Sequence, residues 1–363
     1  MASDTHNIAP DDLVRTHAEA EGASRPPLLV LDPLTTFLDE HGIGAGALQV
    51  EPVGEGHSNV TYAVTRDDGS RFIVRRPPRP PVPPSAHDVL REARVLSALA
   101  GRARVPQVLA VCDDEAVIGA PFYVMDLVAG HVITAAVPDE LDTEADRTRI
   151  GEELIDALVE VHAVDWQAAG LEGFGKPTGY LERQVRRFLG LWEINKTREI
   201  PAVESVGTWL AENMPQSPTA TIVHGDYRLG NTMFALAAPA ELVAIFDWEM
   251  ATIGDPLADL GYFSTLYIDR ADPPAGMFEM SSVTREPGFP ARADLIARYE
   301  ERSGRPMTDI RWYQTLALWK SIVFMEGNYK RAVSGATDDP FLHAFGEGVI
   351  ELAGRAQELA HGT

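Results

Sequence analysis

The chain has 363 residues, of which 45% are hydrophobic and 23% are charged, so a disordered or fibrous protein is excluded. Its formal net charge is −23, and a field of that sign repels phosphate backbones and anionic membranes. We therefore expect neither a nucleic-acid nor a membrane partner. One cysteine, Cys112, excludes an internal disulfide. No leader-like start and no apolar run of about 20 residues is present, which predicts a cytoplasmic protein.

Residues 1 to about 130 predict an N-terminal arm followed by a small β-rich lobe. Residues 1–34 lack clear periodicity and are expected to form a mobile arm that can include a short helix. Apolar alternation predicts strands over 48–53, 61–65 and 71–76, and another strand pair within 117–128. Between them, Ser85 precedes a helical apolar pattern that ends near Leu99. Residues 35–130 are interpreted as one mostly antiparallel lobe with one helix.

Residues 131–363 predict a larger, mostly helical lobe. Ile150, Leu154, Leu158 and Val161 share one face of a long helix, and further helices are expected over 179–192, 205–213 and from 259 onwards. Two short apolar runs, 221–223 and 242–246, interrupt the helical pattern. The fold class expected is α+β, with a small antiparallel lobe and a larger helical lobe.

Each of the two short apolar runs leads into residues that suit phosphoryl transfer. The first is followed by the segment HGDYRLGN, residues 224–231, and the second by DWE, residues 247–249. Moving a γ-phosphoryl group to a hydroxyl requires a carboxylate at that hydroxyl, oxygen ligands for Mg²⁺, and a cation near the transferred group. The candidates are Asp226 for the base, Arg228 for the cation, and Asn231, Asp247 and Glu249 for the metal ligands.

The spacing Asp-x-Arg-x-x-Asn, with the later Asp247, resembles the catalytic loop and metal-binding aspartate of protein-kinase-like folds. The opening His-Gly-Asp resembles the aminoglycoside phosphotransferase and choline kinase branch, which acts on small molecules. This resemblance implies a bilobal fold in which residues 35–130 bind ATP or GTP with Mg²⁺. Residues 131–363 would then carry the catalytic loop and the acceptor site. Beside this loop, His224 is expected to be a structural hydrogen-bonding group, and Asp259 to brace the loop through backbone N–H groups.

The resemblance extends into the first lobe. It implies nucleotide contacts from a glycine loop, a strand, a helix and the link between the lobes: Gly54, Gly56, Ser58, Asn59, Arg75, Glu92, Met125 and Leu127. Asn59 replaces the third glycine of the family loop, and Arg75 replaces the strand lysine. A guanidinium stays charged and can bind phosphate or pair with Glu92. Strand register decides whether Arg75 or Arg76 faces the nucleotide.

A second resemblance concerns the acceptor. The segments GHSNVTY (56–62), RRPP (75–78) and 320–331 resemble the phosphotransferase domain that is fused to some acyl-CoA dehydrogenases. This implies a hydroxyacyl acceptor, CoA thioesters included, in preference to an aminoglycoside. Such an anionic acceptor needs cations, for which the candidates are Arg186, Arg187, Lys320, Lys330 and Arg331. The rings of Trp312, Tyr313, Trp319, Phe324 and Tyr329 lie in the same region and are expected mainly to form core.

Three functions remain open from the sequence. The first is an active small-molecule kinase. The second is a catalytically silent nucleotide-binding module, motivated by Arg75 and the altered glycine loop. The third is a protein kinase, which the His-Gly-Asp loop disfavours. The identity of the acceptor, the choice of ATP or GTP, the number of metal ions and the oligomeric state are not predicted.

Overall fold

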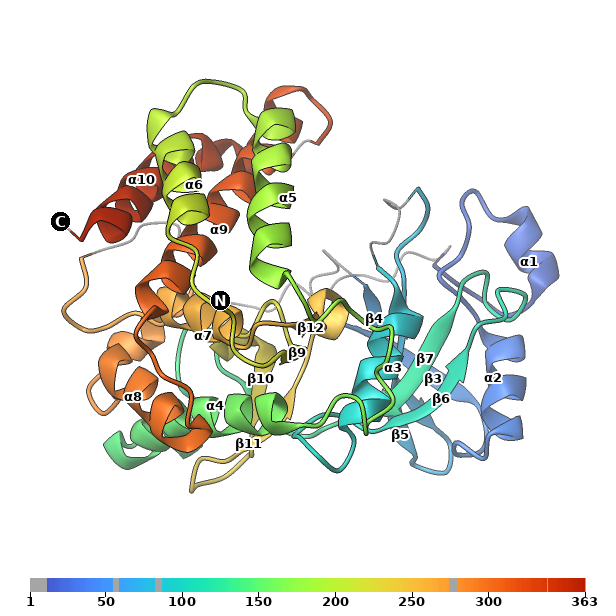
Figure 1. Ribbon diagram of the computed structural model, residues 1–363. Helices are drawn as coiled ribbons and strands as arrows, with labels where there is room; N and C mark the ends of the chain where they lie inside the picture. Colours follow the sequence, from blue (N-terminus) through green and yellow to red (C-terminus); the bar gives the residue numbers. More distant parts are fainter. Residues whose placement is uncertain (1–11, 55–58, 82–86, 274–279, 338, 363) are drawn as a thin grey trace. The chain divides into compact units, whose positions relative to one another are not determined.

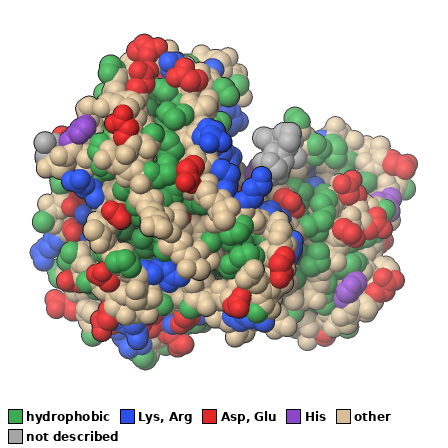
Figure 2. Space-filling view, viewed as in Figure 1, with side chains coloured by type: hydrophobic (Ala, Val, Ile, Leu, Met, Phe, Trp, Pro, Cys, Tyr) green, Lys and Arg blue, Asp and Glu red, His purple; other side chains and the backbone are tan. Residues whose placement is uncertain are grey.

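A computed structural model describes residues 12–54, 59–81, 87–273, 280–337 and 339–362 (Figure 1). The chain divides into two compact units, Met1–Ala129 and Gly130–Thr363. Asp and Glu side chains are scattered over the face seen in Figure 2, in keeping with the net charge of −23. Among the described residues, no helix is both long and apolar enough to cross a bilayer.

The first unit is built on a five-stranded antiparallel sheet in the order β3-β4-β5-β7-β6. In this sheet, register places Arg75 between Thr61 on one neighbouring strand and Tyr123 on the other. Because side chains alternate along a strand, Arg75 and Arg76 point to opposite faces. The strands are β3 Leu48–Val53, β4 Val60–Arg66, β5 Arg71–Arg76, β6 Val108–Cys112 and β7 Phe122–Asp126.

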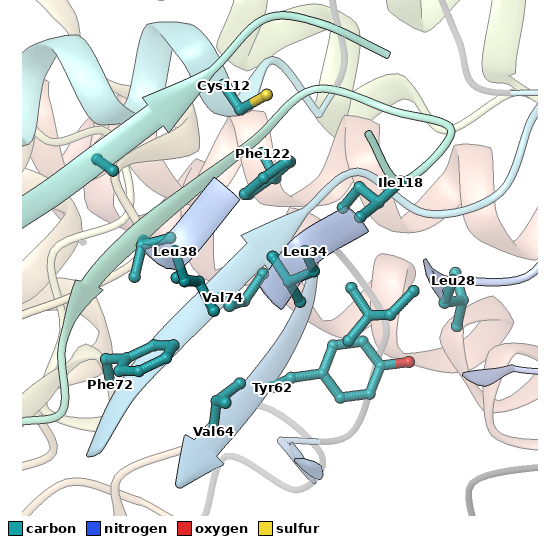
Figure 3. Close-up of a cluster of buried hydrophobic side chains, with 13 residues drawn as sticks. Leu28, Leu34, Leu38, Tyr62, Val64, Phe72, Val74, Cys112, Ile118 and Phe122 are labelled. Carbon is teal, nitrogen blue, oxygen red and sulfur yellow. The ribbon is translucent and has the colours of Figure 1, made fainter. Parts of the chain in front are cut away.

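Two helices cover the two faces of this sheet. Helix α2 (Leu31–Glu40) buries Leu34 and Leu38 in a cluster with Phe72 and Val74 (Figure 3). Helix α3 (Val89–Leu99) packs against β6 and β7 and carries Glu92, which contacts Arg75. The alternation along β5 therefore separates an apolar face beneath α2 from a face that holds a charged pair beneath α3.

The expectation of a mobile N-terminal arm is wrong for the described part of that segment. Residues 12–34 contain β1 (Leu13–Val14), α1 (His17–Gly22), β2 (Leu29–Val30) and the start of α2. Leu28 and Leu29 are buried, and the guanidinium of Arg76 donates hydrogen bonds to the main-chain oxygens of Pro27 and Leu28. Burial lowers the pKa of Arg76 to about 10. A run of only four apolar residues, 28–31, carries too little periodicity to predict this packing from sequence.

Helices dominate the second unit. Its long central helix, α9, contacts α10, α7, α5 and α6. Trp312, Tyr313 and Trp319 on α9 are buried, as expected for a core stripe, whereas Phe324 is 43% exposed. The helices are α4 Glu144–Ala163, α5 Tyr180–Asn195, α6 Pro201–Glu212, α7 Leu257–Leu266, α8 Arg292–Ser303, α9 Ile310–Val333 and α10 Phe341–His361.

Short strand pairs hold the polar loops of the second unit. Strand β9 (Thr221–Val223) pairs with β12 (Thr252–Gly254), and β10 (Thr232–Phe234) pairs with β11 (Leu242–Ile245) and β8 (His131–Val132). The loop 224–231 therefore connects β9 to β10, and the loop 246–251 connects β11 to β12. The mixed α+β class predicted from the sequence is confirmed.

Candidate active site

The loop between β9 and β10 brings Asp226 and Asn231 into contact. The Asn231 Nδ2 donates hydrogen bonds to the main-chain oxygen of Asp226 and to its Oδ2, both at 2.8 Å. Asn231 lies in a short 3₁₀ helix, Leu229–Asn231, and its side chain is buried. Because the Asn231 amide nitrogen is hydrogen-bonded to Asp226, only the amide oxygen Oδ1 of this side chain is available to bind a metal ion.

The first half of this loop is held by a buried carboxylate. Asp259, on α7, accepts hydrogen bonds from the backbone N–H groups of His224 (2.7 Å) and Gly225 (2.8 Å). This is the bracing that the sequence predicted for Asp259. Gly225 has φ +90°, and a Cβ there would lie 2.9 Å from the Met250 oxygen, so the close approach requires glycine.

Asp259 is itself held by a buried histidine, which in turn contacts a tyrosine. His162 Nε2 lies 3.2 Å from Asp259 Oδ2, and His162 Nδ1 lies 2.7 Å from the Tyr299 hydroxyl. Burial lowers the pKa of His162, which keeps the ring neutral. Burial alone would raise the pKa of Asp259, but hydrogen bonds and charges from its neighbours outweigh burial and lower it. Asp259 therefore stays ionised.

His224 connects the two polar loops. The Asp226 N–H donates to His224 Nδ1 (3.2 Å), so His224 Nε2 carries the proton and donates to the main-chain oxygen of Phe246 (2.8 Å). Phe246 N–H in turn donates to the main-chain oxygen of Asn231 at 2.8 Å. The structural role expected for His224 is confirmed, and the residue before Asp247 is tied to Asn231.

Asp247 adopts an unusual backbone conformation. Its φ of 64° and ψ of 59° lie in the left-handed region, which costs energy for a residue other than glycine. The turn is fixed by Trp248, whose indole N–H donates to the Ile245 oxygen at 2.9 Å. Glu249 is half-buried in the next turn. Within the described ranges, no three His, Cys, Asp or Glu side chains gather closely enough to hold a metal ion.

Arg228 and Tyr262 also lie beside Asp226. The Arg228 Nε is 3.6 Å from Asp226 Oδ2, and both side chains are 24% exposed. Burial raises the pKa of Tyr262, and the charge of Asp226 and a hydrogen bond to its side chain act in the same direction. Tyr262 is therefore a neutral phenol that donates to Asp226. The Asp226 carboxylate is thus surrounded by two hydrogen-bond donors, Asn231 and Tyr262, and by the cation of Arg228.

Asp226 lines a pocket of about 450 Å³ within the second unit. Most of the lining is apolar and comes from segments far apart in sequence: Met250, Leu266, Met280, Phe324, Phe341 and Phe345. Besides Asp226, its one charged lining residue among the described residues is Lys320. The sequence motif located Asp226, but these apolar residues carry no signature that distinguishes a pocket lining from core. Tyr262 and His162 were likewise missed, because only the fold brings them to the loop.

The first unit contributes a separate polar cluster. Arg75 Nε donates to Glu92 Oε2 at 2.9 Å, and Arg75 Nη1 donates to Thr61 Oγ1 at 3.0 Å. Asn59 Nδ2 donates to the same Glu92 oxygen at 3.2 Å. The strand register therefore places Arg75 on the face of the sheet where it contacts Glu92, and Arg76 on the opposite face. Of the eight residues predicted to contact the nucleotide, Asn59 and Arg75 therefore both contact Glu92.

The remaining nucleotide candidates are only partly covered by the structure. Gly54 has φ +82°, a conformation that suits glycine in a turn. Gly56 and Ser58 lie outside the described residues. Met125 is buried on β7, and Leu127 is half-buried just after this strand.

Comparisons with known proteins bear on the family of the chain. A model of the phosphotransferase enzyme family matches residues 49–300. Acyl-CoA dehydrogenase family member 10 from Mus musculus is 32% identical over 315 residues, which cover 85% of this chain and 29% of that protein. Family member 11 from Homo sapiens is 31% identical over 322 residues, covering 86% of this chain and 41% of that protein. The chain thus spans less than half the length of these relatives.

Solved structures agree on the fold. A protein from Ralstonia eutropha described as an aminoglycoside phosphotransferase has a TM-score of 0.79 and 32% identity, covering 91% of this chain and 98% of that chain. The GDP complex of aminoglycoside 2′-phosphotransferase-IIIa has a TM-score of 0.58 and 18% identity, covering 89% and 97%, so it bears on the fold alone. The chain therefore belongs to the phosphotransferase enzyme family and has a protein-kinase-like fold.

Proposed function

We propose that this protein transfers the γ-phosphoryl group of ATP or GTP to a hydroxyl of a small molecule, and that the acceptor is a hydroxyacyl compound. The observation that carries the proposal is the position of Asp226. This carboxylate is fixed by Asn231 and Tyr262, and it lines a pocket large enough for a small molecule. An aminoglycoside is less suited, because its many polar groups would meet a mostly apolar lining.

In this reaction Asp226 would accept the proton of the acceptor hydroxyl as the phosphoryl group is transferred. Arg228, 3.6 Å from Asp226, would stabilise negative charge that develops on the transferred group. Asp259 acts only through the backbone N–H groups of the loop that carries Asp226, and His162 acts through Asp259. They are positioning residues.

The donor set suits Mg²⁺, which prefers one or two carboxylates together with phosphate oxygens and water. Asp247 would supply the carboxylate and Asn231 its amide oxygen, consistent with the amide nitrogen being bound to Asp226. When bound, the ion would neutralise charge on the phosphates. Glu249 stays a candidate ligand, but Asp226, Asp247 and Glu249 do not form a three-carboxylate cluster.

We assign the nucleotide phosphates to the polar cluster of the first unit. Arg75 replaces the family lysine. Its hydrogen bonds to Glu92 and Thr61 hold the planar guanidinium group in one orientation. Solved relatives contain GDP, or ADP with hygromycin B, which supports a nucleotide ligand in this family. Gly54, Gly56, Ser58, Asn59, Met125 and Leu127 stay predictions for the same site, and a cytoplasmic location stays a prediction as well.

Two observations support a hydroxyacyl acceptor. The lining of the pocket is mainly apolar, which suits an alkyl chain better than a sugar. Two relatives are acyl-CoA dehydrogenase family members, of which this chain matches only a part. A hydroxyacyl compound would place its hydroxyl at Asp226 and its alkyl chain along the apolar lining.

The test is a nucleotide-consumption assay with hydroxyacyl-CoAs, free hydroxy acids and aminoglycosides as acceptors. We expect turnover on a hydroxyacyl compound, and Asp226→Asn should lower kcat by about 10²–10⁴-fold. Asp165→Asn, an exposed aspartate of the same unit, is the matched control. Nucleotide binding without turnover on any acceptor would contradict the proposal and favour a catalytically silent module. Phosphate found on protein substrates would instead indicate a protein kinase.

A further inference from the structure

The pocket at Asp226 combines an apolar lining with a single lysine. Lys320 lies on α9, one turn before Phe324, and both side chains line the same pocket as Asp226. It also lines a small neighbouring cavity together with Asp259 and Tyr262. A cation beside an apolar wall is costly unless another group solvates or neutralises it.

Protein groups satisfy Lys320 only in part. Its Nζ lies 5.0 Å from the centroid of the Phe188 ring, a cation–π contact. Among the described residues, no carboxylate lies within ion-pair distance of it. Burial lowers the pKa of Lys320 to about 8, while the charges of Asp259 and Asp226 raise it and that of Arg187 lowers it. Counting the described residues alone, the site is therefore short of one negative or strongly accepting group.

We propose that Lys320 is a specificity-determining residue that binds an acyl oxygen of the acceptor while Asp226 binds its hydroxyl. This inference rests on the proposed function. The inference restricts the acceptor to hydroxy acids or their thioesters. A plain alcohol binds Asp226 through its hydroxyl and has no second oxygen for Lys320. A carboxylate and a thioester carbonyl share this chemistry, and both can accept from an ammonium group.

The structure separates Lys320 from the other cations suggested by the sequence. Lys330 lies ten residues further along α9, and its Nζ donates to the main-chain oxygen of Ile194 at 2.6 Å. It does not line the pocket. Arg187 is exposed on α5, and its charge acts on Lys320. Lys330 therefore serves as a matched control on the same helix.

The experiment measures binding of two acyl compounds that lack the hydroxyl and of one alcohol that lacks the acyl oxygen, without nucleotide, so it does not depend on turnover. Hexanoate, hexanoyl-CoA and 1-hexanol are titrated calorimetrically into the full chain and into Lys320→Met, Lys320→Arg and Lys330→Met. We expect Lys320→Met to weaken binding of hexanoate, hexanoyl-CoA or both by about 10- to 100-fold, the usual contribution of a charged hydrogen bond. Binding of 1-hexanol should be unchanged, Lys320→Arg should restore part of the affinity, and Lys330→Met should resemble the parent chain.

The three probes also identify the source of the acyl oxygen. A loss confined to hexanoate indicates a free acid, and a loss confined to hexanoyl-CoA indicates a thioester. Equal weakening of all three probes, no weakening of any, or no binding of either acyl compound to the parent chain would overturn the inference. If selective weakening is found but no acceptor is ever phosphorylated, the proposed function fails while Lys320 remains an acyl-binding residue.

Discussion

Arg75 and Glu92 form an ion pair in the first unit, with Arg75 Nε 2.9 Å from Glu92 Oε2. The Glu92 side chain is 2% exposed and that of Arg75 is 14% exposed. Water therefore screens the pair poorly, and loss of either partner removes part of the compensation of the other charge. The same contact orients the guanidinium, which also donates to Thr61. One pair thus contributes both to the stability of the unit and to the direction of its candidate phosphate-binding group.

We expect Glu92→Ala to lower the free energy of unfolding by about 3 kcal/mol, because it leaves Arg75 without its carboxylate in a buried position. Urea unfolding followed by circular dichroism measures this change. Glu51→Ala, at an exposed position on β3, is the control and should change stability by less than about 0.5 kcal/mol. Similar values for the two variants would show that the pair does not stabilise the unit.

Asp259→Asn should lower kcat by about 10-fold or more and leave the KM for nucleotide largely unchanged, because Asp259 holds the backbone that carries Asp226. Steady-state kinetics measure this on whichever acceptor is turned over. The control is Asp255→Asn, also buried, which accepts from Leu257 N–H and the Tyr313 hydroxyl but not from the loop. Equal losses of kcat in both variants would point to general destabilisation instead of loop positioning.

The chemistry of the site could be predicted because it lies within short segments. Asp226 and Asn231 are five residues apart, and Asp247 lies two residues after the end of a strand that pairs with the one after Asn231. Local sequence therefore contains most of this geometry. Asp259 was also predictable, since a carboxylate at the start of an apolar helix must find buried donors.

The acceptor pocket could not be predicted for the opposite reason. Met280, Phe324 and Phe341 come from three separate segments, and their apolar side chains are equally suited to a core or to a pocket wall. Only the tertiary structure distinguishes buried Trp319 from exposed Phe324 on the same helix. The same limit applies to Leu28 and Leu29, which belong to one buried cluster with residues of a distant strand such as Phe72.

Stability should fall as the pH is lowered below about 6.5, in part because of His162. Burial lowers its pKa in the folded state, so below 6.5 the unfolded chain binds more protons than the folded chain. Thermal unfolding between pH 7.5 and 5 measures this slope. His162→Gln keeps a donor for Asp259 but cannot titrate, and it should show a smaller loss over the same range. An unchanged slope in His162→Gln would contradict a contribution from this residue.

Leu34→Ala should lower the free energy of unfolding by about 2–4 kcal/mol, the usual cost of a cavity at a fully buried leucine. Leu34 is 0% exposed and packs with Phe72 and Val74 on the face covered by α2. Denaturant unfolding measures the change. Val53→Ala, at a site 45% exposed on β3, is the control and should have a much smaller effect. A negligible effect of Leu34→Ala would restore the view of this segment as a loosely attached arm.

Binding of an acyl anion should weaken as the pH rises through about 8, the value to which burial lowers the pKa of Lys320. The groups that act on this lysine are Asp226, Asp259 and Arg187. Below pH 8 the ammonium is charged and attracts hexanoate, which is itself ionised throughout this range. Above pH 8 each further unit should lower the affinity by about ten-fold, because binding then requires uptake of one proton. Lys320→Arg stays charged and should bind with constant affinity to pH 10. If its affinity falls in parallel with that of the parent chain, a group other than Lys320 controls the pH dependence.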